Sequence, residues 1–264
     1  MESKVIPLRA PVERKGLARV AGLDSVVHRL RSTVVTPVRV AELGDPAVTA
    51  PRGIVMYGPP GCGKAHIVSA LAEELGLAEV SVAFTRLGEE PLSGRSLVVI
   101  GDAVSDTDGH LLAEWFDRPD PDAVLSVVIT DRPWELAPEL LAIGRFDRMV
   151  LVPPPDFEAR RLYVRRAVRR VGLAEDEDLE EVIASLEGGT GADIDAVFDA
   201  AAALMANGPD GERPPDLGAI RAASMAHRTD ARRWLEEARS LVAMTATRGL
   251  VDDLVAYLRR HRLI

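Results

Sequence analysis

A glycine-rich segment with one lysine is the strongest chemical signal in the sequence. It reads Gly58-Pro59-Pro60-Gly61-Cys62-Gly63-Lys64-Ala65, follows a short apolar run and leads into a stretch with helical spacing. Glycines let consecutive backbone N–H groups turn inward around a phosphate at a helix N-terminus, where partial positive charge collects. The lysine adds an ammonium group on a long stem that reaches the β and γ phosphates of a nucleotide. The pattern therefore predicts a phosphate-binding loop in which Lys64 holds the phosphates.

Two residues of this loop, Ala65 and Cys62, bear on metal binding and on redox chemistry. Phosphate loops end in Lys-Ser or Lys-Thr, whose hydroxyl binds Mg²⁺, and Ala65 has no hydroxyl. Water and the phosphates themselves can still hold Mg²⁺, so we expect weak metal binding. Cys62 has two interpretations. At a helix N-terminus its thiol could have a lowered pKa and act in redox chemistry, or it is a small side chain that fills a variable position.

Short apolar runs alternate with helical patterns in the part of the chain that carries this loop. The runs have the length of strands, are bounded by glycine, proline or charge, and cover residues 53–57, 80–84, 97–100, 124–130 and 149–152. Residues 19–43 and the segments between the runs have helical spacing. Such alternation is typical of a parallel sheet covered by helices, so the sequence predicts an α/β fold.

The pattern changes after Pro153-Pro154-Pro155, where the strands stop. Helical spacing covers residues 157–170, 179–186 and 193–205, and a glycine- and proline-rich stretch follows at 207–215. We predict four regions: an N-terminal arm over 1–18, an α/β nucleotide-binding domain over 19–154, a small all-α lid over 155–207, and a linker with C-terminal helices over 208–264. Six apolar residues of the last region have the spacing of packing stripes: Leu235, Ala238, Val242, Leu254, Tyr257 and Leu258.

Six ordered motifs give the chain a resemblance to the AAA family of P-loop ATPases over roughly residues 19–205. They are Val20-Ala21-Gly22-Leu23-Asp24, Tyr57-Gly58-Pro59-Pro60-Gly61, Thr130-Asp131-Arg132-Pro133, Gly144-Arg145-Phe146-Asp147-Arg148, Val152-Pro153-Pro154-Pro155-Asp156 and Thr190-Gly191-Ala192-Asp193. The resemblance implies ATP or ADP with Mg²⁺ as cofactors. It also implies a homo- or hetero-oligomeric ring of AAA subunits and a protein client. Residues 234–258 loosely resemble extensions of bacterial members.

The same resemblance assigns residues to the nucleotide. Backbone near Val20 and Ala21 forms part of the adenine pocket, and the lid closes over the nucleotide near Gly191 and Ala192. The phosphate loop and the start of the following helix supply the other implied cofactor-binding residues: Pro60, Gly61, Cys62, Gly63, Lys64, Ala65 and His66.

The implied hydrolytic residues depart from the family pattern. The family ends the strand over 97–100 in Asp-Glu, whose aspartate holds Mg²⁺ through water and whose glutamate activates the attacking water. Here Gly101-Asp102-Ala103 follows the strand, so Asp102 either replaces the glutamate or holds the metal while the base is missing. The polar residue that would orient water from the next strand is Asp131 instead of asparagine. We therefore expect weakened hydrolysis.

Arg145 and Arg148 stand where the family keeps arginine fingers, which reach the γ-phosphate of a neighbouring subunit. Two functions follow. The first is an ATPase that couples ATP binding and hydrolysis to remodelling of a protein or complex. The second is a nucleotide-binding regulatory or scaffold subunit that supplies its fingers to a partner ATPase. Ala65, Gly101 and Ala103 favour the second, whereas the loop lysine and the two arginines favour the first.

Composition limits the classes of partner. The chain of 264 residues is 47% hydrophobic and has a formal net charge of −9, which disfavours nucleic acid and anionic lipid. One cysteine excludes an intrachain disulfide, and the five histidines have no metal-ligand spacing. Neither a secretory segment nor an apolar run of membrane-spanning length is present, so we predict a cytoplasmic protein with no membrane partner.

Overall fold

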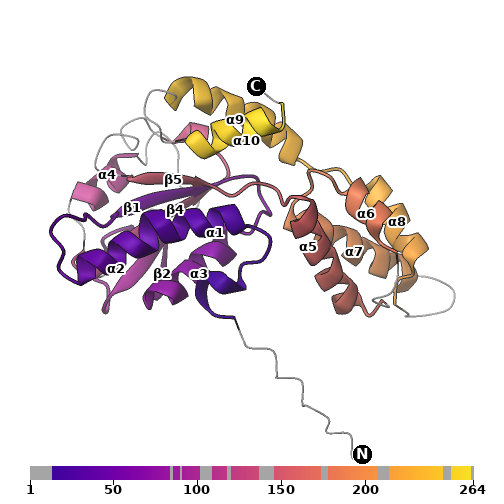
Figure 1. The fold of residues 1–264 in the computed structure, drawn as a ribbon, viewed down its shortest axis with the longest axis horizontal. Helices are drawn as coiled ribbons and strands as arrows, with labels where there is room; N and C mark the ends of the chain where they lie inside the picture. Colours follow the sequence, from indigo (N-terminus) through magenta and orange to yellow (C-terminus); the bar gives the residue numbers. More distant parts are fainter. Residues whose placement is uncertain are drawn as a thin grey trace, which may run out of the picture.

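Five parallel strands form the centre of the structure, in the order β2-β3-β4-β1-β5 (Figure 1). The structure is a computed structural model that describes residues 14–83, 86–89, 91–101, 109–117, 120–136, 146–173, 178–206, 214–245 and 251–262. The strands are β1 (Gly53–Tyr57), β2 (Ala78–Ala83), β3 (Ser96–Gly101), β4 (Ala123–Thr130) and β5 (Arg148–Leu151). All five predicted strands are present, and the predicted α/β class is confirmed.

Burial explains why the strands read as apolar runs. All five residues of β1 are buried, and the first five residues of β3 are buried as well. Because helices cover both faces of a parallel sheet, its central strands are apolar throughout instead of alternating with polar residues. β2 lies at the edge of the sheet, and its residues are exposed or half-buried.

Helices α1 (Asp24–Leu30), α2 (Thr36–Glu42) and α3 (Lys64–Leu75) share an apolar cluster with one face of the sheet. A π-helical turn, η2 (Arg31–Val35), joins α1 to α2 and precedes Pro37, which has no N–H to continue the regular helical bonding. The helix predicted over 19–43 is thus confirmed from Asp24 onward.

The N-terminal segment packs on the α/β domain from Gly16 onward, although the arm was expected to extend to residue 18. A 3₁₀ turn, η1 (Gly16–Arg19), lies against the end of α3. Gly16 N donates to Glu73 Oε2 at 2.9 Å, and Leu17 N donates to Glu74 Oε2 at 3.0 Å. Leu17 is fully buried, so this segment is part of the core.

The opposite face of the sheet is covered by α4 (Gly109–Asp117) and by the C-terminal helices α9 (Ala231–Thr245) and α10 (Asp252–Arg260). The predicted stripes account for the packing, because Leu235, Ala238, Leu254 and Leu258 are buried in this cluster. Val242 and Tyr257 are partly buried against it. The C-terminal helices are therefore structural partners of the sheet.

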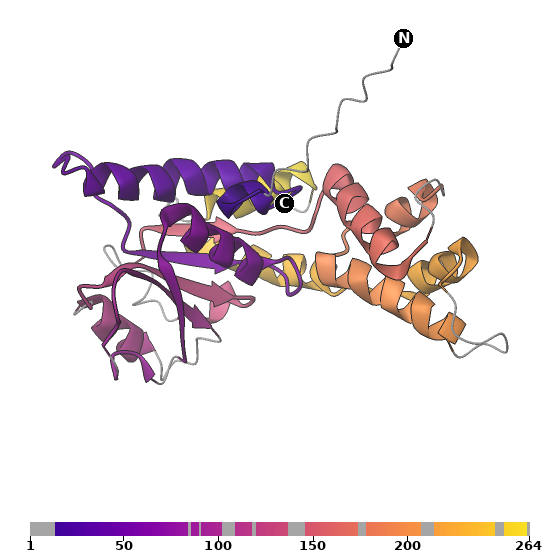
Figure 2. The same ribbon diagram turned by 90° about the horizontal axis from the view of Figure 1, so that it is seen from below.

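Four helices form a separate layer beside the sheet (Figure 2). They are α5 (Phe157–Val171), α6 (Glu180–Ser185), α7 (Gly191–Ala206) and α8 (Leu217–Ala226), and they share an apolar core. Asp156 caps α5 and Asp216 caps α8, each by accepting a bond from a backbone N–H three residues later. α8 lies in the segment assigned above to the linker and C-terminal helices, and Ile220 and Ala223 pack in the lid core.

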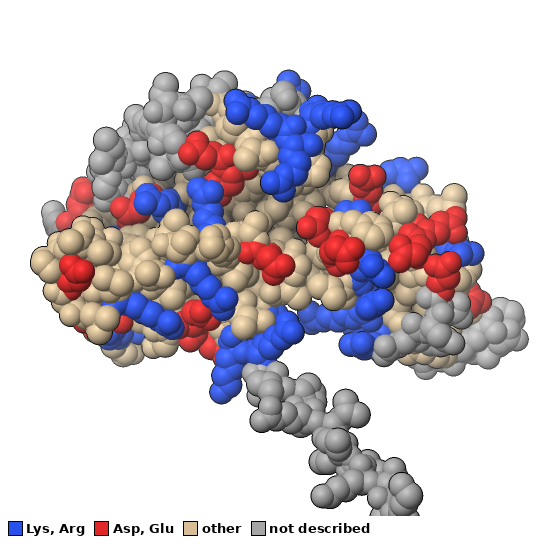
Figure 3. Space-filling view, viewed as in Figure 1, with Lys and Arg blue, Asp and Glu red and all other residues tan. Residues whose placement is uncertain are grey.

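Arginine side chains gather over α9 and α10 on the surface of the molecule (Figure 3). Arg232 and Arg233 are 85% and 80% exposed and lie 3.9 Å and 3.0 Å from Glu236 and Glu237, one helical turn away. This arrangement is typical of a solvated helix face. None of the helices in the described ranges is long and apolar enough to cross a bilayer.

Candidate nucleotide site

The predicted phosphate loop connects the end of β1 to the start of α3. Gly58, Gly61 and Gly63 have φ values of 153°, 79° and 83°, and the last two are left-handed conformations that favour glycine. A Cβ atom on Gly58 would lie 2.1 Å from the carbonyl oxygen of Val152, so no side chain fits there. Gly63 is the N-cap of α3, which turns the first N–H groups of the helix toward the loop.

Lys64 lies inside this loop. Its Nζ donates to the carbonyl oxygens of Gly58 at 2.8 Å and Pro59 at 2.9 Å, and the residue is 9% exposed. Burial lowers the pKa of Lys64, and the nearby charges of Cys62 and Asp131 oppose that shift. An ammonium has three protons, so one remains for a third acceptor.

The residues present fit a nucleotide phosphate. The space where a Cβ of Gly63 would stand has no neighbour within 4 Å, so an anion can approach the backbone there. This position adjoins the positive end of α3 and the Lys64 ammonium. Ala65 and His66 are exposed at the start of α3, and Pro60 is exposed in the loop.

The loop offers little to Mg²⁺ besides the phosphates it would hold. Ala65 contributes no oxygen, and the described residues contain no group of three histidine, cysteine, aspartate or glutamate side chains that could hold a metal ion. Asp102, the predicted metal ligand, and Ala103 lie outside the described residues. Gly101 is the last residue of β3, so it lies at the same C-terminal ends of the strands as the loop. Its Cα lies opposite that of Ile129 in β4.

The lid contacts the loop directly. Ala192 N donates to the carbonyl oxygen of Gly61 at 3.2 Å. A Cβ on Gly61 would lie 2.6 Å from the Ala192 Cβ and 2.7 Å from Thr190 Oγ1, so glycine is required for this approach. The structure thus brings together the two halves of the predicted site, the loop and the start of α7 at Gly191.

Asp193 holds this end of the lid. Its Oδ2 accepts from Thr190 N at 2.7 Å and from Thr190 Oγ1 at 2.9 Å, while Asp193 N donates to Thr190 Oγ1 at 3.2 Å. This is a capping box in which the third residue is aspartate. Burial raises the pKa of Asp193, but bonds from Thr190, His227 and Thr229 outweigh it and leave the pKa below its ordinary value.

The adenine side of the predicted site adjoins α5. Val20 is buried and Ala21 is exposed, and the Tyr163 hydroxyl donates to the Ala21 carbonyl oxygen at 3.2 Å. A Cβ on Gly22 would lie 2.4 Å from the Ala159 Cβ, so the two segments touch. The backbone assigned to adenine therefore lies where the α/β domain meets the lid.

His66 lies beside two arginines at this junction. Burial lowers its pKa, and the charges of Arg19 and Arg166 lower it further. The imidazole at the start of α3 therefore takes up a proton less readily than a free histidine does.

Cys62 is not a reactive thiol. It is 5% exposed and belongs to the apolar cluster between the sheet and α3. Burial raises its pKa to about 12, and the opposing charge of Lys64 is too weak to reverse that shift. The redox interpretation is wrong, because desolvation dominates over the helix N-terminus at this position.

Asp131 directly follows β4 and lies close enough to Lys64 to affect its pKa. Two hydrogen bonds hold the turn that carries Asp131. Arg132 N donates to Thr130 Oγ1 at 3.0 Å, and the indole N–H of Trp234 in α9 donates to the Asp131 carbonyl oxygen. The structure therefore places Asp131 near Lys64, and adds a contact from the C-terminal helices that the sequence did not predict.

The two predicted arginine fingers have different outcomes. Arg145 lies outside the described residues. Arg148 begins β5, opposite Ile54 at the start of β1, whereas the phosphate loop follows the end of β1. Because the strands are parallel, Arg148 lies at their N-terminal ends and the loop lies at their C-terminal ends, about 10 Å away along the strand direction. Arg148 is exposed and donates to the Asp147 carbonyl oxygen at 2.6 Å.

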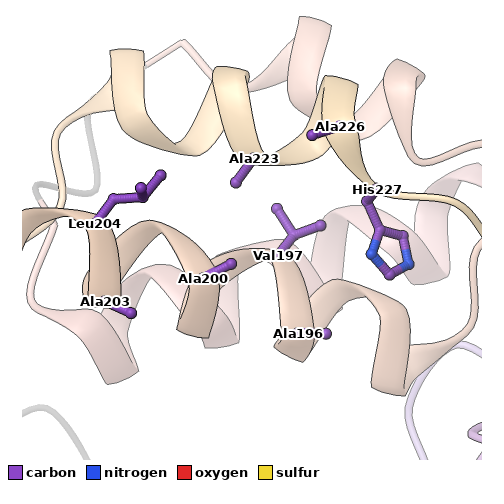
Figure 4. Close-up of a pocket in the computed structure, with 8 residues that line it drawn as sticks. All are labelled: Ala196, Val197, Ala200, Ala203, Leu204, Ala223, Ala226 and His227. Carbon is purple, nitrogen blue, oxygen red and sulfur yellow. The ribbon is translucent and has the colours of Figure 1, made fainter.

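A groove of about 690 Å³ lies between α7 and α8, away from the phosphate loop. Figure 4 shows small side chains along both helices and His227 at one end of the row. Its lining is apolar apart from that imidazole: Ala196, Val197, Ala200, Ala203, Leu204, Ala223 and Ala226. None of its described lining residues is a lysine or an arginine.

Three residues around the site were not found by sequence reasoning: His227, Thr229 and Trp234. His227 Nε2 lies 2.7 Å from Asp193 Oδ1, and Thr229 Oγ1 donates to Asp193 Oδ2 at 2.8 Å. The Thr190-x-x-Asp193 spacing signals a helix start, but nothing local to residues 227–234 signals their partners.

Comparison with known protein families supports the geometry. Residues 54–111 match the family described as "ATPase family associated with various cellular activities (AAA)". This range contains β1 from Ile54 onward, the phosphate loop, α3, β2 and β3. It is the part of the chain in which the loop follows a strand and opens a helix.

Several known proteins are similar to the chain over 67% to 75% of its length. "Protein SAV" of Sulfolobus acidocaldarius is 34% identical over 210 residues, and a "Proteasome-activating nucleotidase" of Pyrococcus abyssi is 32% identical over 213 residues. An uncharacterized AAA domain-containing protein of Schizosaccharomyces pombe is 28% identical over 233 residues. The chain spans 27%, 53% and 30% of these three relatives, in that order. Taken with the parallel sheet and the loop, these similarities show that the chain carries a P-loop domain of the AAA family.

Proposed function

We propose that the chain binds ATP or ADP between the α/β domain and the lid, with Lys64 on the phosphates and Val20, Ala21, Gly191 and Ala192 around the base. The observation that carries this proposal is the contact between Ala192 N and the Gly61 carbonyl oxygen beside the buried Lys64. It puts the lid directly over the loop. A nucleotide that touches both parts would hold them together.

The chain's own residues would act mainly by binding and orientation. Lys64 and the N-terminal N–H groups of α3 neutralise the phosphates, and the lid at Ala192 limits water at the loop. Mg²⁺, when bound, would neutralise charge on the phosphates. Asp131 carries a carboxylate beside Lys64 where an asparagine would offer a donor to water, and Ala65 offers no metal ligand. Both features support weakened hydrolysis.

We infer that the nucleotide cycle of this chain remodels a protein or complex, within a ring of AAA subunits. Similarity to proteins named as proteasome-activating nucleotidases supports this class of function.

The second candidate is a regulatory subunit that completes the site of a neighbour. The position of Arg148 supports this candidate. Arg148 is exposed at the N-terminal ends of the strands, whereas the chain's own loop lies at their C-terminal ends. An arginine there can contribute to phosphate chemistry only in another subunit.

Nucleotide binding and steady-state ATP turnover of the purified chain, measured on the same samples, test both candidates. Lys64→Ala should weaken ATP and ADP binding about ten- to a hundred-fold, because it removes a charge-assisted contact. Lys15→Ala is the matched control, since Lys15 is exposed and precedes the fold. ATP and ADP binding that is as tight in Lys64→Ala as in the wild type would refute the proposed site.

Turnover separates the two candidates. Turnover that disappears in Lys64→Ala would support the remodelling ATPase. Binding without turnover would favour the regulatory subunit, and Arg148→Ala should then leave binding intact while it lowers the turnover of the partner. A chain that stays monomeric at all concentrations with ATP present would contradict both ring-based readings.

A further inference from the structure

The segment between α8 and α9, together with the first turn of α9, contacts both sides of the candidate site. At one end, Thr229 Oγ1 donates to Asp193 Oδ2 at 2.8 Å, and His227 Nε2 lies 2.7 Å from Asp193 Oδ1. At the other end, the Trp234 indole N–H donates to the Asp131 carbonyl oxygen. We call residues 227–234 the strut.

The lid end of the strut leads straight to the phosphate loop. Asp193 is bonded to Thr190, and the adjacent Ala192 donates from its backbone N–H to Gly61. A Cβ on Gly61 would lie within 2.7 Å of Thr190 Oγ1 and the Ala192 Cβ, so the loop and this segment are in close contact. Thr229 is thus connected to the loop by a continuous series of contacts through Asp193, Thr190 and Ala192.

The core end of the strut is held by aromatic rings as well as by the hydrogen bond. Trp234 is 6% exposed, and its ring centroid lies 6.4 Å from that of Tyr57 and 5.7 Å from that of Trp134. Tyr57 is the last residue of β1, directly before the loop, and Trp134 follows the Asp131 turn. Trp234 thus contacts the segments that end two neighbouring strands.

The middle of the strut is short and bonded to itself. Thr229 Oγ1 also accepts from Ala231 N at 3.2 Å, and Trp234 N donates to the Asp230 carbonyl oxygen at 3.0 Å. These bonds start α9 within two residues of the Asp193 contact. A short segment that is bonded at both ends and leads directly into a helix has less freedom to move than a flexible linker.

We propose that the strut positions Asp131 and Ala192 on either side of the bound phosphates, so that the packing of α9 and nucleotide binding are energetically coupled. This inference rests on the proposed ATP or ADP site. Thr229 and Trp234 are positioning residues in it, since they act through Asp193 and Asp131. The C-terminal helices then respond to the nucleotide state of the loop.

Removing the hydrogen bond at either end of the strut tests the coupling. Thr229→Val removes one hydroxyl and keeps the branched side chain, and Trp234→Phe removes the indole N–H and keeps an aromatic ring. Each should weaken ADP binding by the full chain about five-fold or more, the usual lower range for coupled sites. The double variant should bind ADP within about two-fold of the single variants. The loss of one hydrogen bond already removes the coupling between the two ends, so the second loss adds little.

Two matched controls separate coupling from loss of stability. Trp115 is 8% exposed, and its indole N–H donates to Ser126 Oγ at 2.9 Å on the same strand β4, far from the loop end. Thr33 Oγ1 donates to the Arg29 carbonyl oxygen at 2.8 Å within the α1–α2 helix. Trp115→Phe and Thr33→Val remove the same chemical groups as the strut variants and should leave ADP affinity unchanged, and urea unfolding of all four variants reports their loss of stability. Equal effects of controls and strut variants, or effects that multiply in the double variant, would overturn the inference.

Hydrogen exchange without nucleotide decides the same question independently of ADP binding. Thr229→Val should speed exchange at residues 130–132, and Trp234→Phe should speed it at 190–193, each at the end remote from the substitution. Acceleration confined to the substituted end would refute the strut. Failure of the wild-type chain to bind ADP would instead refute the proposed function, while the exchange result still decides whether the two ends are coupled.

Discussion

Arg29 Nη1 lies 2.6 Å from Asp253 Oδ1, and this ion pair joins α1 to α10 near the last residue of strand β1. The Asp253 side chain is 15% exposed and that of Arg29 is 32% exposed, so the pair is largely removed from water. Asp253 Oδ2 also accepts from Leu151 N at 3.5 Å. The buried hydroxyl of Tyr57 beside this pair has no hydrogen-bond partner among the described residues, and burial followed by the Asp253 charge raises its pKa.

Removing the cation of this pair should cost more than removing the charge of the acid. Arg29→Met leaves a carboxylate uncompensated in a poorly solvated position, so we expect a loss of about 2 kcal/mol of unfolding free energy, between surface and fully buried pairs. Asp253→Asn keeps the shape and an acceptor oxygen, and should change stability by less than about 1 kcal/mol. Urea unfolding of both variants and of the double variant checks this. The double variant should recover most of the loss, and equal losses in the two single variants would contradict the asymmetry.

Stability should depend on pH through Asp253. Burial raises the pKa of this carboxyl, and the charge of Arg29 offsets the effect only in part. Because the folded state then takes up a proton at a higher pH than the unfolded chain does, protonation stabilises the fold. The unfolding free energy of the wild type relative to Asp253→Asn should therefore rise as the pH falls from 7 toward about 4. A difference that is flat or falls over this range would show that the carboxylate is favourably held.

Cys62 should resist alkylation in the folded protein. A thiol whose pKa is raised to about 12 holds roughly a thousand-fold less thiolate at pH 8 than an ordinary cysteine. We expect iodoacetamide to label the native chain at least about a hundred-fold more slowly than the chain in urea. The chain has one cysteine, so mass spectrometry reports this site alone. Similar rates in the two conditions would restore the reactive interpretation.

Substitution of two loop glycines should separate backbone strain from the lid contact. Gly61 and Gly63 both have left-handed backbones, but only at Gly61 would a Cβ meet the lid, at 2.6 Å. Gly63→Ala should lower the unfolding free energy by about 1 kcal/mol from strain alone. Gly61→Ala adds overpacking against Ala192 and Thr190, for a total of about 2–4 kcal/mol. Equal losses in urea unfolding would mean that the lid moves away without cost.

Local features of the sequence predicted much of the α/β domain. The run over 53–57 is apolar because both faces of β1 are buried, and the glycines of the loop are required by backbone geometry that neighbouring residues define. α8 was missed because it follows a glycine- and proline-rich stretch and consists largely of small residues. Its Ile220 and Ala223 reveal a buried face only once α6 and α7 are present.

The sequence by itself determined the phosphate loop, the strand–helix alternation and the start of the lid helix, since each depends on residues within a few positions of one another. The tertiary structure alone decided which distant residues meet. Trp234 lies 103 residues from Asp131, and Thr229 lies 36 residues from Asp193, so no periodicity links the members of either pair. It also decided that Cys62 is inert, because the desolvation that raises its pKa comes from the packing of α3 on the sheet.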